Sequence, residues 1–340
     1  MNKKAGLVLL AAMLVLLVLA GCGSNKEGAA SSPPASASGE TAPPQGGEGG
    51  VIGVIPKSTL YDYWKSVRVG AEKAAGENGY SIVFQGTAKD TDVEGQVKII
   101  EDFITKGVKA IVISPVSADA MVPALEKADA AGIPVIIIDG DLNSDIPHSF
   151  VSTDNVAAAA MAAEKMNELI GGQGKIAVVS EVAGSIQGAA RENGFIDKIK
   201  SYGGYQLLNT FYSEGDRNLA FNITQDIFTS NSDIKGIFST NEGSSVGVSL
   251  GVDASGKKDD VAVIGYDSSE DLLQAIRNGV IDGTISQDPA AIGYTGVANA
   301  VKVLKGEAVE KDVPVSAVYV DKNNIDNEDI QKILYPLGKQ

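Results

Sequence analysis

The chain of 340 residues is poor in the side chains that most enzymes and metalloproteins depend on: it has one cysteine, one histidine and one tryptophan. A single cysteine, Cys22, excludes a disulfide within the chain and a metal cluster held by several cysteines. The only histidine, His148, has no nucleophile motif near it, which argues against a Ser-His-Asp hydrolase. These shortages predict a protein that is not an enzyme and that uses no cofactor and no metal.

Positive charge is also scarce. The chain has 28 Lys and Arg against 43 Asp and Glu, and its formal net charge is -15. Because phosphate binding depends on clustered Lys and Arg, we do not expect a nucleic acid as a partner.

The first residues have the pattern of an export signal. Lys3 and Lys4 precede an apolar run over residues 5–20, and the sequence Leu-Ala-Gly-Cys ends at Cys22. This pattern predicts a lipoprotein signal peptide over residues 1–21, cleavage before Cys22 and a lipid on its sulfur. The alternative, an uncleaved membrane anchor, is disfavoured because a spanning helix needs about 20 apolar residues. We expect an extracytoplasmic protein, lipid-anchored to the outer face of the cell membrane.

A change in composition separates this signal from the rest of the chain. Residues 22–50 contain almost no large apolar side chain, which predicts a flexible linker after the lipidated cysteine. From Val51 the composition is that of a globular protein, and about 290 residues remain, enough for two hydrophobic cores.

The globular part alternates between short apolar runs and longer segments with helical periodicity. Nine runs are typical of buried strands, at 51–55, 81–85, 110–114, 134–138, 175–180, 205–210, 236–239, 261–265 and 283–286. Nine segments are predicted helices, at 64–78, 93–106, 118–131, 156–170, 189–201, 219–229, 244–254, 269–278 and 290–305. The alternation predicts an α/β fold with two Rossmann-like lobes, each built on a parallel sheet of four to six strands.

Polar residues stand where several of these strands end. They are Lys57, Asp139, Asn241, Asp267 and Gln287. Ligands of open α/β sheets bind outside the carboxyl ends of the strands, so these five residues are candidate ligand contacts. Each one could instead cap a helix or form a turn.

Aromatic residues gather at the start of the first predicted helix, where Tyr63 precedes the only tryptophan, Trp64. An aromatic face can pack against a sugar ring while polar groups bind the hydroxyls. We therefore assign both to the ligand site, with core packing of Trp64 as the alternative.

These motifs carry a family resemblance that extends from Val51 to the C-terminal region. The chain resembles the type 1 periplasmic binding proteins, especially their ribose- and allose-binding branch. The matching stretches include IGVIPKSTLYDYWKSVRVGAEKAA, GVKAIVISPVSADAMVPALEKADAAGIPVIIIDGD, GAARENGF, IFSTNEGSSVGVSL, VIGYDSSEDLLQAIRNG and GTISQDPAAIGYTGVANAVKVLKGE.

The resemblance implies roles for nine residues. The ligand-binding positions that it indicates are Lys57, Tyr63, Trp64, Asp139, Arg191, Asn193, Asn241, Asp267 and Gln287. Two departures disfavour ribose itself. Gly140 stands where ribose binders have an arginine, and Gly215 stands where an aromatic is expected, which leaves space for a bulkier or differently hydroxylated ligand.

The resemblance also implies an architecture and a role. Three crossovers would join an N-terminal lobe (51–152 plus 288–315) to a C-terminal lobe (153–287 plus 316–340). We expect a monomer that closes on a monosaccharide or similar polyol and delivers it to the permease of an ABC importer.

Two other functions use the same fold. A sensor would present its ligand to a membrane histidine kinase or chemoreceptor. A transcriptional repressor would need a basic DNA-binding motif in the first fifty residues, where this chain has its signal and linker. The residues leave the ligand open among pentoses, hexoses, cyclitols and furanose signals.

Overall fold

The computed structural model describes residues 48–59, 62–336 and 338, all within one compact unit. The predicted signal peptide, Cys22 and the linker up to residue 47 lie outside the described residues. Within the described part, no helix is long and apolar enough to cross a membrane.

The first lobe is built on a six-stranded sheet in the order β12-β5-β4-β3-β1-β2, with every neighbouring pair parallel. Its strands are β1 (Val51–Ile55), β2 (Ser81–Phe84), β3 (Ala110–Ile113), β4 (Val135–Ile138), β5 (Ser149–Thr153) and β12 (Asp312–Val315). Its helices are α1 (Asp62–Glu77), α2 (Val93–Lys106), α3 (Val122–Ala130) and α9 (Pro289–Leu304).

The second lobe is built on a seven-stranded sheet in the order β13-β11-β10-β9-β6-β7, with β8 paired to β6. Its strands are β6 (Gly174–Ser180), β7 (Tyr205–Leu207), β8 (Phe211–Tyr212), β9 (Ile234–Ser239), β10 (Ala262–Tyr266), β11 (Gly283–Ser286) and β13 (Val318–Asp321). Its helices are α4 (Asn155–Ile170), α5 (Ile186–Ser201), α6 (Arg217–Ser230), α7 (Glu242–Ala254), α8 (Glu270–Arg277) and α10 (Glu328–Leu334). Only β13 runs antiparallel to its neighbour, β11.

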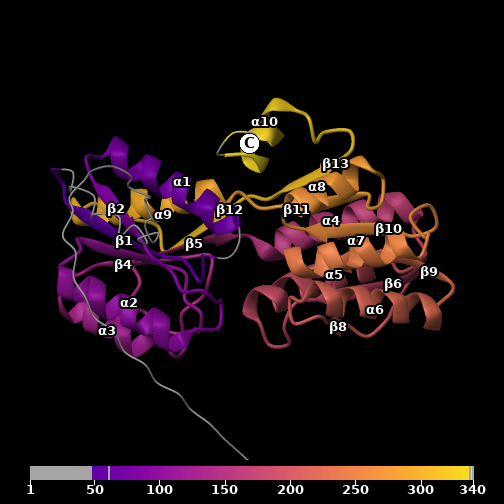
Figure 1. The fold of residues 1–340 in the computed structure, drawn as a ribbon, viewed down its shortest axis with the longest axis horizontal. Helices are drawn as coiled ribbons and strands as arrows, with labels where there is room; N and C mark the ends of the chain where they lie inside the picture. Colours follow the sequence, from indigo (N-terminus) through magenta and orange to yellow (C-terminus); the bar gives the residue numbers. More distant parts are fainter. Residues whose placement is uncertain (1–47, 60–61, 337, 339–340) are drawn as a thin grey trace, which may run out of the picture. The chain divides into compact units, whose positions relative to one another are not determined.

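Each sheet is covered by helices on both faces, because both faces of its central strands are apolar. In β3, Ala110 and Val112 pack with α1 and α9, whereas Ile111 and Ile113 pack with α2 and α3. In the second lobe, α4 and α5 cover one face and α6, α7 and α8 the other. Figure 1 shows these layers. Strands buried on both faces are expected in parallel sheets, and the predicted fold class is confirmed. The predicted size is wrong for the second sheet, which has seven strands instead of four to six and one antiparallel edge strand.

The chain passes between the lobes three times. It leaves β5 of the first sheet for α4, returns from β11 to α9, and leaves β12 for β13. In Figure 1 the late helix α9 lies among the indigo elements of the first lobe, which makes the return visible. The crossings lie within residues 153–155, 286–289 and 315–318, next to one another at the edges of both sheets.

The nine predicted helices and nine predicted strands all occur, but five elements were not predicted. They are β5, β8, β12, β13 and α10. The strands among them are short or polar on one side, and β12 contains Pro314, which is tolerated at a sheet edge. Pattern reading fails for such strands because it depends on continuous apolar runs.

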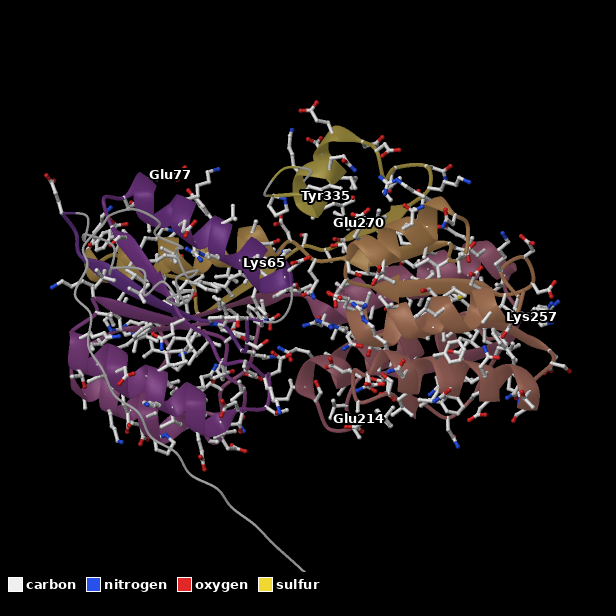
Figure 2. The ribbon with its side chains drawn as sticks, viewed as in Figure 1. Lys65, Glu77, Glu214, Lys257, Glu270 and Tyr335 are labelled. Carbon is white, nitrogen blue, oxygen red and sulfur yellow. The ribbon has the colours of Figure 1, made fainter. Side chains whose placement is uncertain are left out.

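The C-terminal segment packs on the second lobe. Leu334, at the end of α10, is buried in the core formed with α6, α7 and α8. The next residue, Tyr335, donates a hydrogen bond from its hydroxyl to Glu270 Oε2 at 3.1 Å, and Figure 2 shows the two side by side. The segment after the third crossing is therefore part of this lobe.

Two glycines allow α1 and α9 to approach closely. A Cβ on Gly70 would lie 1.8 Å from the carbonyl oxygen of Ala290, and a Cβ on Gly293 would lie 2.0 Å from that of Val67. Side chains at either position would force the helices apart. This contact matters for the site, because α1 begins with the two aromatics and α9 follows Gln287.

Candidate functional site

A cavity of about 130 Å³ is lined by both lobes. For scale, a cavity of about 150 Å³ holds one benzene molecule, so this space suits a single six-membered ring. Its walls are Lys57, Tyr63, Trp64, Asp90, Asp139, Glu181, Gln187, Arg191, Asn241, Glu242, Gly243, Asp267 and Gln287. Eight of the nine residues predicted from the sequence are among them.

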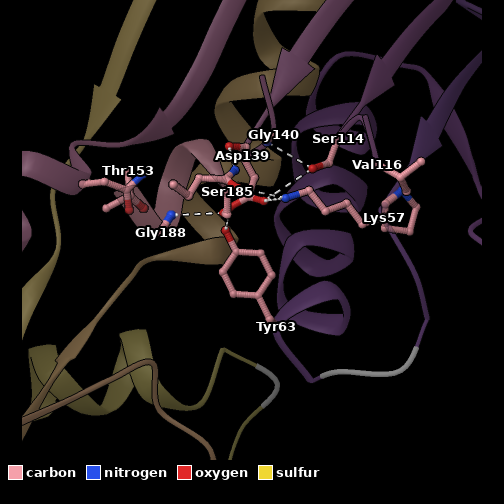
Figure 3. A network of polar contacts seen from close by, with 12 residues as sticks. Lys57, Tyr63, Ser114, Val116, Asp139, Gly140, Thr153, Ser185 and Gly188 are labelled. Atoms are coloured by element: carbon pink, nitrogen blue, oxygen red, sulfur yellow. Dashed lines mark hydrogen bonds and ion pairs between the residues drawn. The ribbon is translucent and has the colours of Figure 1, made fainter. Parts of the chain in front are cut away.

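Asp139 is the centre of the first-lobe half (Figure 3). Its Oδ1 accepts a hydrogen bond from the Tyr63 hydroxyl at 2.8 Å, and its Oδ2 lies 3.5 Å from Lys57 Nζ. Ser114 Oγ donates a long hydrogen bond to Oδ2 at 3.4 Å. Asp139 directly follows β4 and has a φ of 56°, in the left-handed region that non-glycine residues rarely adopt. Such strain is typical of residues whose direction matters for function.

The two aromatics at the start of α1 differ in environment. Their rings meet edge to face with centroids 4.9 Å apart. Trp64 is only 4% exposed and packs in the core with α9. It also lines the cavity, so both alternatives for this residue apply. Burial raises the pKa of Tyr63 well above its usual value, and the charge of Asp139 raises this pKa further. Tyr63 is therefore a protonated donor at neutral pH.

Asp267 is the centre of the second-lobe half. It follows β10, and its φ of 72° is again left-handed. Its Oδ1 accepts from Gln287 Nε2 at 2.6 Å, and its Oδ2 accepts from the backbone N–H of Glu242 at 2.9 Å. Burial raises the pKa of Asp267, although Arg191 and these hydrogen bonds counteract the rise.

Gln287 connects this half to the crossovers. Besides donating to Asp267, it accepts a hydrogen bond through Oε1 from Thr153 Oγ1 at 2.7 Å. Thr153 ends β5 at the first crossing, and Gln287 follows β11 at the second. A side chain that lines the cavity therefore belongs to one of the three connecting segments and is bonded directly to another.

Arg191 is held rigidly under the cavity. Its guanidinium lies 4.0 Å above the centre of the Tyr266 ring, and it donates to Asn155 Oδ1 at 2.7 Å and to the Thr240 carbonyl at 2.9 Å. The side chain is 5% exposed. Tyr266 donates to the same Asn155 oxygen at 3.1 Å, so the position of the guanidinium is fixed from two directions.

Asn241 has two roles. Its Oδ1 accepts from the backbone N–H of Ser244 at 3.0 Å, which caps the N-terminus of α7 as the alternative interpretation expects. The residue also lines the cavity.

The structure does not bring Asn193 to the cavity. Asn193 does not line the cavity and is exposed to solvent. It lies two residues after Arg191 in α5, which is about 200° around a helix, so the two side chains cannot face the same site.

Gly140 packs closely against the neighbouring backbone. A Cβ there would lie 2.9 Å from the Pro115 carbonyl oxygen and 3.0 Å from Ser114 Oγ. A side chain at this position would therefore require the neighbouring backbone to shift.

Sequence reasoning missed five wall residues: Asp90, Glu181, Gln187, Glu242 and Gly243. Gln187 joins the lobes, because it accepts from Lys57 Nζ at 3.2 Å and donates to the Asp139 carbonyl. Glu181 directly follows β6, so the strand-end rule could have found it. Asp90 lies in the loop after β2, where the sequence offers no comparable signal.

The cavity walls are suited to binding a ligand through hydrogen bonds. Carboxylates and amides supply acceptors, while Tyr63, Lys57 and Arg191 supply donors. Such walls suit a small molecule with several hydroxyl groups. Among the described residues, no group of three or more His, Cys, Asp and Glu could hold a metal ion.

Comparison with known proteins gives consistent matches. The model of the periplasmic binding protein domain matches residues 52–308. The ribose import binding protein of Haemophilus influenzae is 31% identical over 74% of this chain and 85% of its own. The D-allose-binding periplasmic protein of Escherichia coli is 28% identical over 75% of this chain and 85% of its own.

A solved structure extends this similarity to the fold. An ABC transporter solute-binding protein from Agrobacterium vitis, solved with bound D-fucose, is 37% identical with a TM-score of 0.77. The match covers 84% of this chain and 100% of that protein.

Proposed function

The chain belongs to the type 1 periplasmic binding protein family of sugar-binding proteins, and from this premise we propose that it captures a monosaccharide or similar polyol and delivers it to an ABC importer. The observation that carries the proposal is the cavity itself. Eight residues predicted from the sequence or from the family resemblance as ligand contacts come from both lobes and converge on a space of about 130 Å³.

The division of the site between lobes supports a closing mechanism. Asp139, Lys57 and Tyr63 belong to the first lobe, whereas Asp267 and Arg191 belong to the second. A ligand bonded to both halves stabilises the closed arrangement, and the three crossings are the hinge about which the lobes move. The Lys57–Gln187 hydrogen bond between the lobes adds to closure.

The walls of this site can supply the ligand affinity that such a function requires. A micromolar dissociation constant corresponds to about -8.2 kcal/mol, which for a ring of about a dozen heavy atoms is about 0.7 kcal/mol per atom. Such efficiency requires that most hydroxyls are paired with charged or amide groups, which these walls supply.

The test is a thermal-shift screen of the full chain in mild detergent against pentoses, hexoses, cyclitols and nucleosides. A ligand at 100 times its dissociation constant adds about 2.7 kcal/mol, a rise of several degrees. A rise with one sugar class, followed by loss of uptake of that sugar in a deletion strain, supports the proposal. No rise with any compound contradicts it. Binding without any effect on uptake would instead favour presentation to a histidine kinase or chemoreceptor.

We also propose that a lipid on Cys22 holds the protein at the outer face of the membrane as a monomer. The sequence before Cys22 supports this anchor, and each buried methylene of an acyl chain adds about 0.8 kcal/mol. Metabolic labelling with a fatty acid should label the unmodified chain and not Cys22→Ala. An unmodified chain that takes up no label would contradict the lipid anchor.

A further inference from the structure

The walls of the cavity carry more negative than positive charge. Five carboxylates line it, from Asp90, Asp139, Glu181, Glu242 and Asp267, against the two cations Lys57 and Arg191. The formal excess is three negative charges in a small space. Burying like charges without compensation is unfavourable, so the partners of each carboxylate decide what the site requires.

Three of these carboxylates are compensated by the protein. Asp139 is bonded to Tyr63 and paired with Lys57. Asp267 accepts two hydrogen bonds, as described above. Glu242 pairs with Arg217 from outside the cavity at 2.9 Å.

The two cations are already engaged. Lys57 Nζ contacts Asp139 and Gln187, and the Arg191 guanidinium contacts Asn155, the Thr240 carbonyl and the Tyr266 ring. Neither one forms an ion pair with Asp90 or Glu181 among the described residues.

The remaining two carboxylates keep acceptor capacity. Asp90 Oδ1 is buried and has no hydrogen-bond partner in the described part of the chain. Glu181 accepts one hydrogen bond, from Ser185 Oγ, and no cation pairs with it there. Asp90 belongs to the first lobe and Glu181 follows β6 of the second, so both halves of the cavity contribute an acid without a direct ion-pair partner among the described residues.

We propose that the ligand is an amino sugar or a similar amine-bearing polyol, whose ammonium group is bound by Asp90 and Glu181. This inference rests on the proposed function and narrows its ligand class. An ammonium group has three donors and no acceptor, and it carries the positive charge that the walls lack. A hydroxyl group supplies one donor and no charge. A hydrogen bond between two charged groups is about twice as strong as a neutral one.

The experiment compares matched ligands on the full chain in mild detergent by titration calorimetry. Each pair consists of a 2-amino hexose, such as D-glucosamine or D-galactosamine, and its parent hexose, measured near pH 6.5. We expect the amine to bind about tenfold more tightly than its parent, and raised salt to weaken the amine more than the parent.

Three variants locate the effect. Asp90→Asn and Glu181→Gln should each reduce the ratio of amine to parent affinity severalfold. Asp253→Asn is the matched control, because it removes one negative charge from an exposed position of α7 that does not line the cavity. Its ratio should equal that of the unmodified chain, which separates local contacts from the general attraction of an acidic protein.

The outcomes distinguish the two proposals. If parent hexoses bind as tightly as their amines, or if neither Asp90→Asn nor Glu181→Gln lowers the ratio, the amine inference is overturned while the proposed sugar binding stands. If neither amines nor parent sugars of any class bind, both are overturned.

Discussion

The two lobes have the same scaffold and place equivalent residues in different surroundings. Both sheets share one strand order, with β2-β1-β3-β4-β5 corresponding to β7-β6-β9-β10-β11. Asp139 follows β4 and Asp267 follows β10, both with left-handed φ. Each backbone N–H bonds to the next strand, Asp139 to the Val151 carbonyl and Asp267 to that of Ile285.

Their partners differ. Asp139 is held by Tyr63 and Lys57, whose side chains also line the cavity. Asp267 is held by Gln287, which is bonded to a crossing segment, and by the backbone of α7. The same backbone conformation therefore positions a carboxylate in each lobe. Only the second carboxylate, that of Asp267, is hydrogen-bonded directly to a residue of the hinge.

The largest loss of ligand affinity should follow from Asp267→Ala. The substitution removes a ligand acceptor and leaves Gln287 Nε2 and the Glu242 N–H without their partner, at about 1–3 kcal/mol each. We expect affinity for the best ligand to fall by at least about a hundredfold. Calorimetry measures this loss, and circular dichroism checks the fold. Wild-type affinity in a folded variant would contradict the central role of Asp267.

A second prediction concerns the acid beside Asp267. Burial raises the pKa of Glu242 from 4.5 to about 6, in spite of its pairing with Arg217. The pKa of Glu242 is higher in the folded chain than in the unfolded chain, so the folded state binds this proton more tightly. The resulting stabilisation of the folded state is complete below pH 4.5 and is lost as pH rises through 6. Between pH 4 and 7, unfolding free energy should therefore fall by about 2 kcal/mol more in the wild type than in Glu242→Gln.

Denaturant titrations of both proteins at several pH values measure this difference. Parallel pH profiles would show that Glu242 does not titrate as its burial implies.

Asp139→Ala should have a smaller effect than Asp267→Ala. Lys57 retains its hydrogen bond to Gln187, and both Lys57 and Tyr63 can donate to the ligand instead. We expect affinity to fall about tenfold, or about 1.4 kcal/mol. Side-by-side calorimetry of the two alanine variants tests the comparison. Equal losses would show that the hinge connection of Asp267 adds nothing to binding.

The smallest effect is expected for Thr153→Val, a change of similar size. It removes the hydrogen bond to Gln287 without altering any cavity wall. We expect an affinity loss of about fivefold, from about 1 kcal/mol of lost support for Gln287. Ser66→Ala removes a half-buried hydroxyl on α1 that does not line this cavity, and it serves as the control. Equal ligand affinities of Thr153→Val and Ser66→Ala would show that the Thr153–Gln287 hydrogen bond does not contribute to ligand binding.

Much of the site could be predicted from residues alone. Asp139, Asp267 and Gln287 follow strong apolar runs, and the carboxyl ends of parallel strands face ligands in such folds. Asp90 and Gln187 could not be predicted in this way, because a loop and a helix turn reach the cavity only after the lobes meet.

Trp64 shows a different limit. Its position at the start of α1 predicts a cavity wall, but only packing shows that it is also core. Trp64→Ala should therefore reduce stability by about 3–5 kcal/mol as well as binding. Its effects on ligand affinity and on folding would be hard to separate, so it is a poorer probe than Asp267.

The sequence by itself predicted the α/β alternation, the fold class and five cavity residues at strand ends, because apolar periodicity and strand-end chemistry are local properties of the chain. The aromatic cluster added Tyr63 and Trp64, and the family resemblance added Arg191. Tertiary structure decided the rest. It placed Asn193 outside the site through helix geometry, bonded Gln287 to Thr153 across two crossings, and left Asp90 Oδ1 buried without a partner in the described residues. These features depend on residues far apart in the chain, whose contacts and compensation of charge exist only once both lobes have packed.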